Sequence, residues 1–198
     1  MKRRYLITKL LTVLAVVFSF AVFRPNLALA HCDTMDGPVV KAAQKALQTK
    51  NVNLVLIWVQ EKDEAAIKQA FRQTLAVRGL NREARDLADR YFFETLVRLH
   101  RAGEGEPFTG IEPAGTDLGP IIRGADKALQ NDALEPLLKL FPAVATAEIR
   151  IRFKEVMTKK AYHLNDVPAG REYVKAYISF LHYLEHLDNR ERTSKRYE

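Results

Sequence analysis

The chain has 198 residues, enough for one domain or two small ones with an apolar core, and its formal net charge is +7. Five of its 31 basic residues and none of its 24 acidic ones fall within residues 1–30, which leaves 26 basic and 24 acidic residues from position 31 onward. This nearly neutral remainder lacks the concentrated basic face that a phosphate backbone requires, so we expect no nucleic-acid partner.

Residues 1–30 read as a secretory signal peptide. A basic start is followed by the apolar run 10–23 and by Ala28-Leu29-Ala30, a small-residue pattern typical of a cleavage site. The run of 14 residues is short for a membrane span, which needs about 20, although an uncleaved anchor is the alternative. We expect an exported protein, periplasmic or extracellular, that begins at His31 and keeps no stable membrane span.

An internal repeat follows the predicted leader. GPVVKAAQKALQ (37–48) aligns with GPIIRGADKALQ (119–130) at an offset of 82 residues, with seven of twelve positions identical. The same offset places Tyr91 on Tyr173 and His100 on His182. We therefore predict an all-α, internally duplicated helical bundle, with two copies of about 80 residues related by a pseudo-twofold axis. The expected organisation is repeat 1 (31–102), a turn-rich linker (103–118), repeat 2 (119–187) and a charged, frayed tail (188–198).

Apolar residues recur every three or four positions in both repeats, which indicates helices and not strands. Gly-Pro opens each copy, and proline is well tolerated in a first helical turn. The predicted helices of the first copy are 38–49, 53–60, 63–78 and 82–102. Those of the second copy are 120–130, 133–141, 144–160 and 168–187.

The stretch HCDTMDG (31–37) is the strongest candidate site. After cleavage, His31 would offer an α-amine and an imidazole, and Cys32 a backbone nitrogen and a thiolate, donors that suit nickel, copper or zinc. Cys32 is the only cysteine of the chain, so it cannot form an internal disulfide. Asp36 is a further candidate ligand, and it could instead cap the helix that begins at Pro38.

Three more histidines are candidate ligands. His100 and His182 occupy the same position of the two repeats, so duplication could bring them together on one ion. His182 and His186 are spaced i and i+4 and could form a metal pair by themselves. The alternative is that His100 and His182 are core histidines bonded to backbone carbonyls.

HCDTMDG resembles the metal hook of nickel superoxide dismutase, a helical-bundle enzyme whose mature chain begins His-Cys-Asp. His31, Cys32, Asp33 and Gly37 match that pattern, while the second cysteine of that family falls on Asp36, its proline on Met35 and its tyrosine on Val39. The resemblance implies nickel bound by the amine, the first amide, the ring and thiolate. The whole chain also resembles a group of exported bacterial helical proteins of unknown function that begin HCDTMDGPVV.

We therefore expect a transition-metal-binding protein that uses His31 and Cys32, with redox chemistry on a small oxygen species or simple binding and delivery as its activity. No Ser-His-Asp, phosphate-loop or HExxH pattern suggests another enzymatic route. The rival hypothesis is a structural or interaction module in which Cys32 forms an intermolecular disulfide. A sensor with a small-molecule pocket between the repeats, and association into a homo-oligomer, also stay open.

Overall fold

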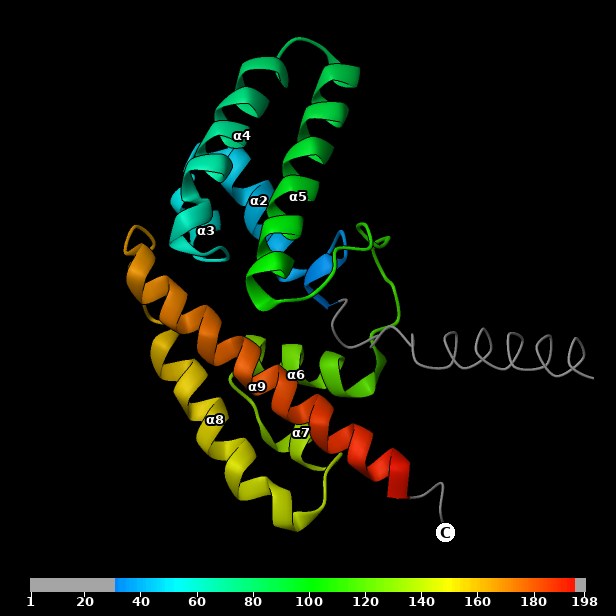
Figure 1. Cartoon of the computed structure of the whole chain (residues 1–198). Coiled ribbons are helices and arrows are strands. Elements are labelled where there is room, and N and C mark those ends of the chain that lie inside the picture. Colours follow the sequence, from blue (N-terminus) through cyan, green and yellow to red (C-terminus); the bar gives the residue numbers. More distant parts are fainter. Residues whose placement is uncertain (1–30, 195–198) are drawn as a thin grey trace, which may run out of the picture.

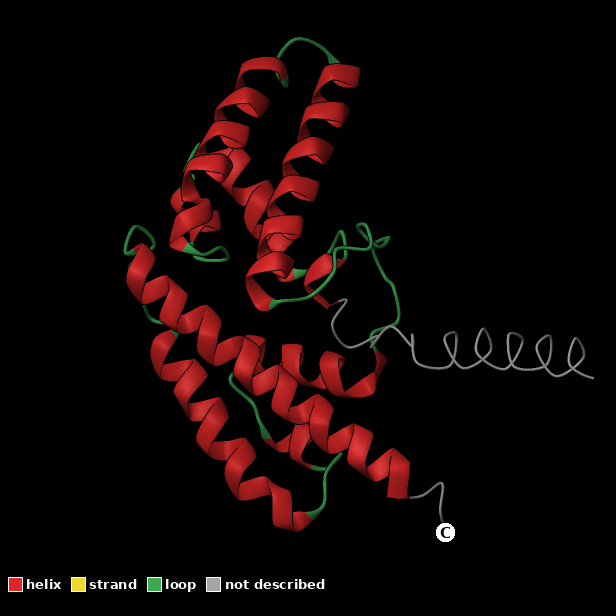
Figure 2. Ribbon diagram, viewed as in Figure 1, coloured by secondary structure: helices red, strands yellow, loops and turns green. Residues whose placement is uncertain are grey.

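The described part of the chain is all-helical. The computed structural model describes residues 31–194, so the signal peptide predicted for residues 1–30 lies outside it. Within residues 31–194 there are eight α-helices and no β-strand beyond an isolated bridge between Thr34 and Glu112, which confirms the all-α prediction (Figures 1 and 2). None of the helices in this part is long and apolar enough to cross a membrane.

Two halves present the same order of elements. The first half contains α2 (Pro38–Thr49), α3 (Asn53–Leu56), the 3-10 turn η2 (Glu61–Asp63), α4 (Glu64–Val77) and α5 (Arg82–Glu104). The second half contains α6 (Gly119–Asn131), α7 (Glu135–Leu138), the 3-10 turn η3 (Ala143–Ala145), α8 (Thr146–Lys159) and α9 (Val167–Ser194). The bounds of α7, η3 and α8 lie 82 residues after those of α3, η2 and α4.

The helix ends agree with the sequence pattern except in α3, α7 and α9. The helix predicted for residues 53–60 ends at Leu56, and Ile57, Trp58 and Val59 are buried in the turn that follows it. The helix predicted for 133–141 is likewise only the four residues of α7. At the other end, α9 runs to Ser194, so most of the tail expected to fray is helical.

Each half is built around a helical hairpin. In the first half, Phe71 of α4 packs against Phe92 of α5, and Arg78 donates two hydrogen bonds to the Asp89 carboxylate at 2.7 and 2.9 Å. In the second half, Phe153 of α8 packs edge-on against Phe180 of α9. Buried aromatic pairs of this kind contribute about 0.5–1.5 kcal/mol beyond the area that they bury.

The turn after α3 joins the two halves. A Cβ atom added to Gly170 of α9 would lie 2.3 Å from Cγ2 of Ile57, so only glycine permits this approach. The ring of Trp58 meets the ring of Tyr177 edge-on, with centroids 6.1 Å apart. Arg171 donates to the Val59 carbonyl at 3.0 Å and to Glu64 at 2.6 Å. The start of α9 is therefore fixed on the first half, which brings the middle of α9 towards the end of α5 (Figure 1).

Candidate functional site

The first described residues, 31–34, are buried inside the molecule. His31, Cys32, Asp33 and Thr34 are each at most 5 % exposed. The linker after α5 covers them, because Glu112 donates its N–H to the Asp33 carbonyl at 2.8 Å and accepts from the Met35 N–H at 2.9 Å. Gly37 permits the tight turn that follows, since a Cβ atom there would lie 2.5 Å from the His31 carbonyl oxygen.

The ring of His31 is an anchor between the chain start and the second half. Its Nε2 lies 2.9 Å from Oδ2 of Asp126 on α6, and its Nδ1 lies 3.3 Å from the hydroxyl of Tyr177 on α9. Burial raises the pKa of Tyr177 well above its usual value, so this hydroxyl keeps its proton and can donate it to Nδ1. Which of the two groups donates in the contact between Nδ1 and the Tyr177 hydroxyl depends on the tautomer of the ring. Both ring nitrogens of His31 are therefore occupied by protein groups.

Cys32 lines a small, partly open space that we call the chain-start cavity. The cavity has a volume of about 10 Å³, close to the space needed by a single water-sized particle. The residues that line it come from the chain start, from α5 and from α9: His31, Cys32, Arg101, Glu104, Ile178, Leu181, His182 and Glu185. A space of this size can hold an ion or a water molecule, and the exposed side chain of His182 lies at its edge.

The ionisable groups that line the chain-start cavity are Cys32, Glu104, Glu185, His31, Arg101 and His182, and Asp33 lies next to Arg101. Burial raises the pKa of the Cys32 thiol well above its usual value, and the nearby Glu104 raises it further. Burial raises the pKa of Glu185 to about 7 and that of Asp33 to about 6. Burial also raises the pKa of Glu104, although Arg101 opposes the change. Each pKa rises chiefly because burial removes the hydration of the charged form, and the neighbouring acidic groups add to the change.

Arg101 ties the chain start to the end of α5. The guanidinium is 5 % exposed, and its nitrogens lie 3.4 Å from the Asp33 carboxylate, 3.4 Å from the Glu104 carboxylate and 3.9 Å from the Glu106 carboxylate. This guanidinium alone cannot balance Asp33, Glu104 and Glu185 together. Oδ1 of Asp33 and Oε1 of Glu104 are buried without a hydrogen-bond partner in the described structure.

His100 and Glu104 present an unusual pair of acceptors. Nδ1 of His100 donates to the Trp58 carbonyl at 2.9 Å, and burial lowers the pKa of His100 to about 4. The ring is therefore neutral, and its Nε2 carries a lone pair. This Nε2 lies 3.5 Å from Oε1 of Glu104 without an acceptable hydrogen bond. Two facing acceptors are stable only with a proton or a cation between or beside them.

The structure brings together some of the sequence-predicted ligands and separates others. His31, Cys32 and His182 line the chain-start cavity. His100 does not line it, but its Nε2 lies 3.5 Å from Oε1 of Glu104, which does. Asp36 is exposed and accepts a hydrogen bond from the Gly115 N–H at 3.0 Å, so its carboxylate fixes the linker. This bond lowers the pKa of Asp36. His186 is exposed and does not line the cavity.

The sequence reasoning missed the acidic residues of the site. Glu104 lies 82 residues before His186, at the offset noted in the sequence, and Glu185 lies three residues after His182 on the same helix face. These spacings are the sequence signals that could have identified both residues. Across residues 31–194, no three histidine, cysteine, aspartate or glutamate side chains are already arranged to hold a metal ion. An ion in the chain-start cavity would need His182, Glu104 or Glu185 to change rotamer.

Comparisons with known proteins identify a family but no activity. A search of curated proteins and a search of solved structures each found no match. A family model, described as a family of unknown function (DUF6448), matches residues 36–183 and therefore most of the chain. The match starts after the buried segment 31–34. It includes helices α2 to α8 in full and the first part of α9. The chain belongs to this family of unknown function, DUF6448.

Proposed function

We propose that this protein is an exported protein that binds one transition metal ion in the chain-start cavity. The observation that carries the proposal is the buried, under-compensated set of donors: a thiol, two carboxyl groups with raised pKa values, and the facing acceptors of His100 and Glu104. A divalent cation would compete with protons for these groups and would satisfy their lone pairs. The cavity volume fits an ion.

The proposed ligands are the Cys32 thiolate and side chains of His182, Glu104 and Glu185. A mixed set of sulfur, nitrogen and oxygen donors favours zinc, nickel or copper over calcium or magnesium. The His31 ring serves as an anchor because Asp126 and Tyr177 occupy its nitrogens. If the leader is removed before His31, the new α-amine adds a nitrogen donor at the chain start, next to Cys32.

Native mass spectrometry of the exported chain tests the proposal, because one spectrum reports both its first residue and any bound ion. Titration of the metal-free chain with zinc, nickel and copper salts, followed by calorimetry, then gives affinity and stoichiometry. We expect one ion per chain, and at least about a tenfold loss of affinity in Cys32→Ser and in His182→Ala.

His186→Ala is the matched control, since His186 is the same residue type one turn further along α9 and is exposed like His182, but it does not line the cavity. We expect this variant to keep the affinity of the unmodified chain. Equal affinities in His182→Ala and His186→Ala, together with no loss in Cys32→Ser, would exclude the chain-start cavity as the metal site.

The rival function is an interaction module with Cys32 in an intermolecular disulfide. Cys32 is 5 % exposed, and two sulfur atoms must approach to about 2.05 Å to form the bond. The segment 31–34 would have to leave its buried position first, which places this function second. A covalent dimer on a non-reducing gel that disappears in Cys32→Ser would favour it.

We infer in addition that the two halves are copies of one duplicated unit, packed about an approximate twofold axis. The 82-residue offset of GPVVKAAQKALQ and GPIIRGADKALQ supports this inference, as does the same offset in the bounds of three pairs of elements. Lys50 and Asp132 add to it, because they end α2 and α6 with φ of 56° and 50°, a conformation that few non-glycine residues adopt.

A further inference from the structure

The stretch HYLEH (182–186) of α9 contains a pair of histidines that the proposed metal site uses only in part. His182 and His186 are both exposed and are spaced i and i+4 in a continuous helix, so their rings lie one turn apart on the same face. The same spacing separates the two histidines of the HExxH pattern, which share one zinc ion. Glu185 lies between them in sequence and lines the chain-start cavity together with His182. One member of the pair therefore belongs to the cavity, and the other lies outside it.

His182 also marks the side from which an ion enters the chain-start cavity. Among the residues that line this cavity, His182 is the exposed one, whereas Cys32 and Arg101 are each 5 % exposed. An ion that arrives from solvent therefore meets the His182 ring before it meets the Cys32 thiol. Because no three metal-binding side chains are prearranged within residues 31–194, the ion must be held at the surface while the side chains of the cavity change rotamer.

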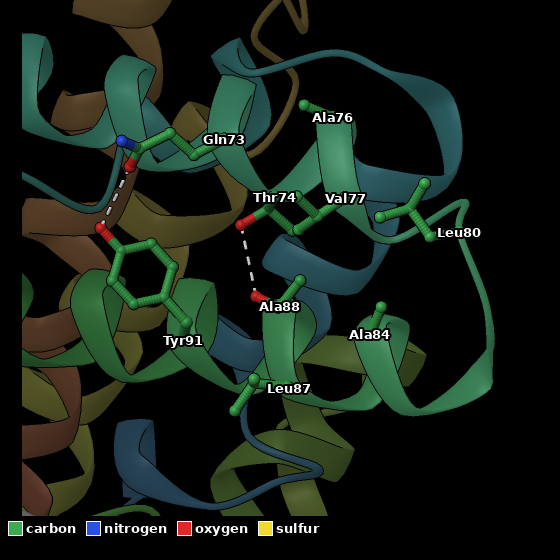
Figure 3. A pocket seen from close by; sticks show the side chains of 9 residues that line it. All are labelled: Gln73, Thr74, Ala76, Val77, Leu80, Ala84, Leu87, Ala88 and Tyr91. Atoms are coloured by element: carbon green, nitrogen blue, oxygen red, sulfur yellow. Dashed lines mark hydrogen bonds between the residues drawn. The ribbon is translucent and has the colours of Figure 1, made fainter.

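A larger hollow, between α4 and α5, does not compete for the ion. It has a volume of about 810 Å³, and none of the nine side chains that line it belongs to histidine, cysteine, aspartate or glutamate (Figure 3). Its polar groups are already paired: Thr74 donates to the Ala88 carbonyl at 3.2 Å, and Tyr91 donates to Gln73 at 3.3 Å. This hollow therefore lacks the nitrogen and sulfur donors that a transition metal ion prefers, in contrast to the exposed histidines of α9.

We propose that His182 and His186 form a capture site that binds the metal ion first and passes it to the chain-start cavity. The inference rests on the proposed function, because it describes how the ion reaches Cys32. His182 belongs to both sites, so it stays bound while a change of its rotamer carries the ion inward. His186 is then replaced by ligands of the cavity, and the Cys32 thiol releases its proton to solvent as the thiolate binds.

The capture site speeds metal loading without adding affinity. His186 holds the ion only in the intermediate, so its removal lowers the population of that intermediate and slows loading at low metal concentration. The affinity of the filled cavity depends on the free and fully loaded states alone, and His186 contacts the ion in neither. Because the dissociation constant is the ratio of the release rate to the loading rate, release must slow by the same factor as loading.

Stopped-flow mixing of the metal-free exported chain with a nickel salt tests the capture site. The thiolate-to-nickel charge-transfer absorption reports the reaction, because this band appears only when the ion reaches Cys32. In the unmodified chain, the loading rate should rise with nickel concentration and then level off, since the rearrangement becomes limiting once the capture site is full. In His186→Ala, loading at low nickel should be at least about tenfold slower and should stay proportional to the nickel concentration. Release into excess chelator should slow by the same factor.

His163→Ala is the matched control, since His163 is an exposed histidine in the loop between α8 and α9 and does not line the cavity. It should load and release nickel like the unmodified chain, and circular dichroism checks the fold of both variants. Equal loading rates in His186→Ala and the unmodified chain would overturn the capture site and leave the proposed function intact. If the unmodified chain shows no charge-transfer band even at equilibrium, the proposed function itself fails, and the capture site fails with it.

Discussion

Glu185→Gln tests whether the chain-start cavity carries excess negative charge. The pKa of Glu185 is raised from 4.5 to about 7, so the folded chain holds a proton that the unfolded chain releases between these values. The stability that this proton contributes is fully present below pH 4.5 and is lost as the pH rises through 7. The full pKa shift of Glu185 corresponds to about 3 kcal/mol of unfolding free energy. Because the side chain is partly exposed to solvent, we expect a change in unfolding free energy of about 1–2 kcal/mol.

Glutamine keeps the shape of the side chain and cannot ionise, so the variant should not lose this stability as the pH rises. We expect Glu185→Gln to match the unmodified chain near pH 4.5 and to exceed its free energy of unfolding by about 1–2 kcal/mol at pH 8 in metal-free buffer. The midpoint of thermal unfolding at pH 8 should rise by about 2–8 °C. Urea unfolding followed by circular dichroism at a series of pH values measures the difference.

Glu172→Gln is the control on the same helix, because Glu172 is exposed and far from the cavity in sequence. It should change the pH dependence little. Parallel pH profiles for Glu185→Gln and the unmodified chain would refute the charge argument. With zinc or nickel added, the order should reverse, since the variant loses a proposed ligand and gains less stability from the ion.

Two glycine substitutions test the close contacts that place the site, with Gly79→Ala as the common control. Gly37→Ala should lower the free energy of unfolding by about 2–3 kcal/mol and speed hydrogen exchange in residues 31–34, because its Cβ would meet the His31 carbonyl oxygen at 2.5 Å. Gly170→Ala should cost a similar amount by displacing Ile57, and should leave exchange in residues 31–34 less affected. Gly79 has no atom within 4 Å of such a Cβ, so Gly79→Ala should alter stability by less than about 1 kcal/mol in urea unfolding. Equal losses in all three variants would show that close approach is not the cause.

The amino-acid sequence by itself determined the helical architecture. Apolar periodicity and the Gly-Pro starts are local features, and they located α2, α4, α5, α6, α8 and most of α9 within two or three residues of their observed bounds. Local signals also singled out His31 and Cys32, since the leader pattern ends at Ala30. The repeat offset, readable from the sequence alone, drew attention to His100 and His182.

Only the tertiary structure decided which of these residues meet. The halves contact each other through Ile57 and Gly170, whose approach depends on a missing Cβ and not on any periodic pattern. Ile57, Trp58 and Val59, which follow α3, are buried in that contact, a placement that helical periodicity alone does not predict.

The same packing gave the polar side chains of the site partners that differ from those predicted from the sequence. It occupied the His31 ring with Asp126 and Tyr177, directed Asp36 to the linker and placed Glu104 and Glu185 beside Cys32. These partners are separated by tens of residues along the chain, and no local pattern encodes their distance. The sequence could therefore name the chemical groups of a site, while burial in the folded chain set their protonation and their partners.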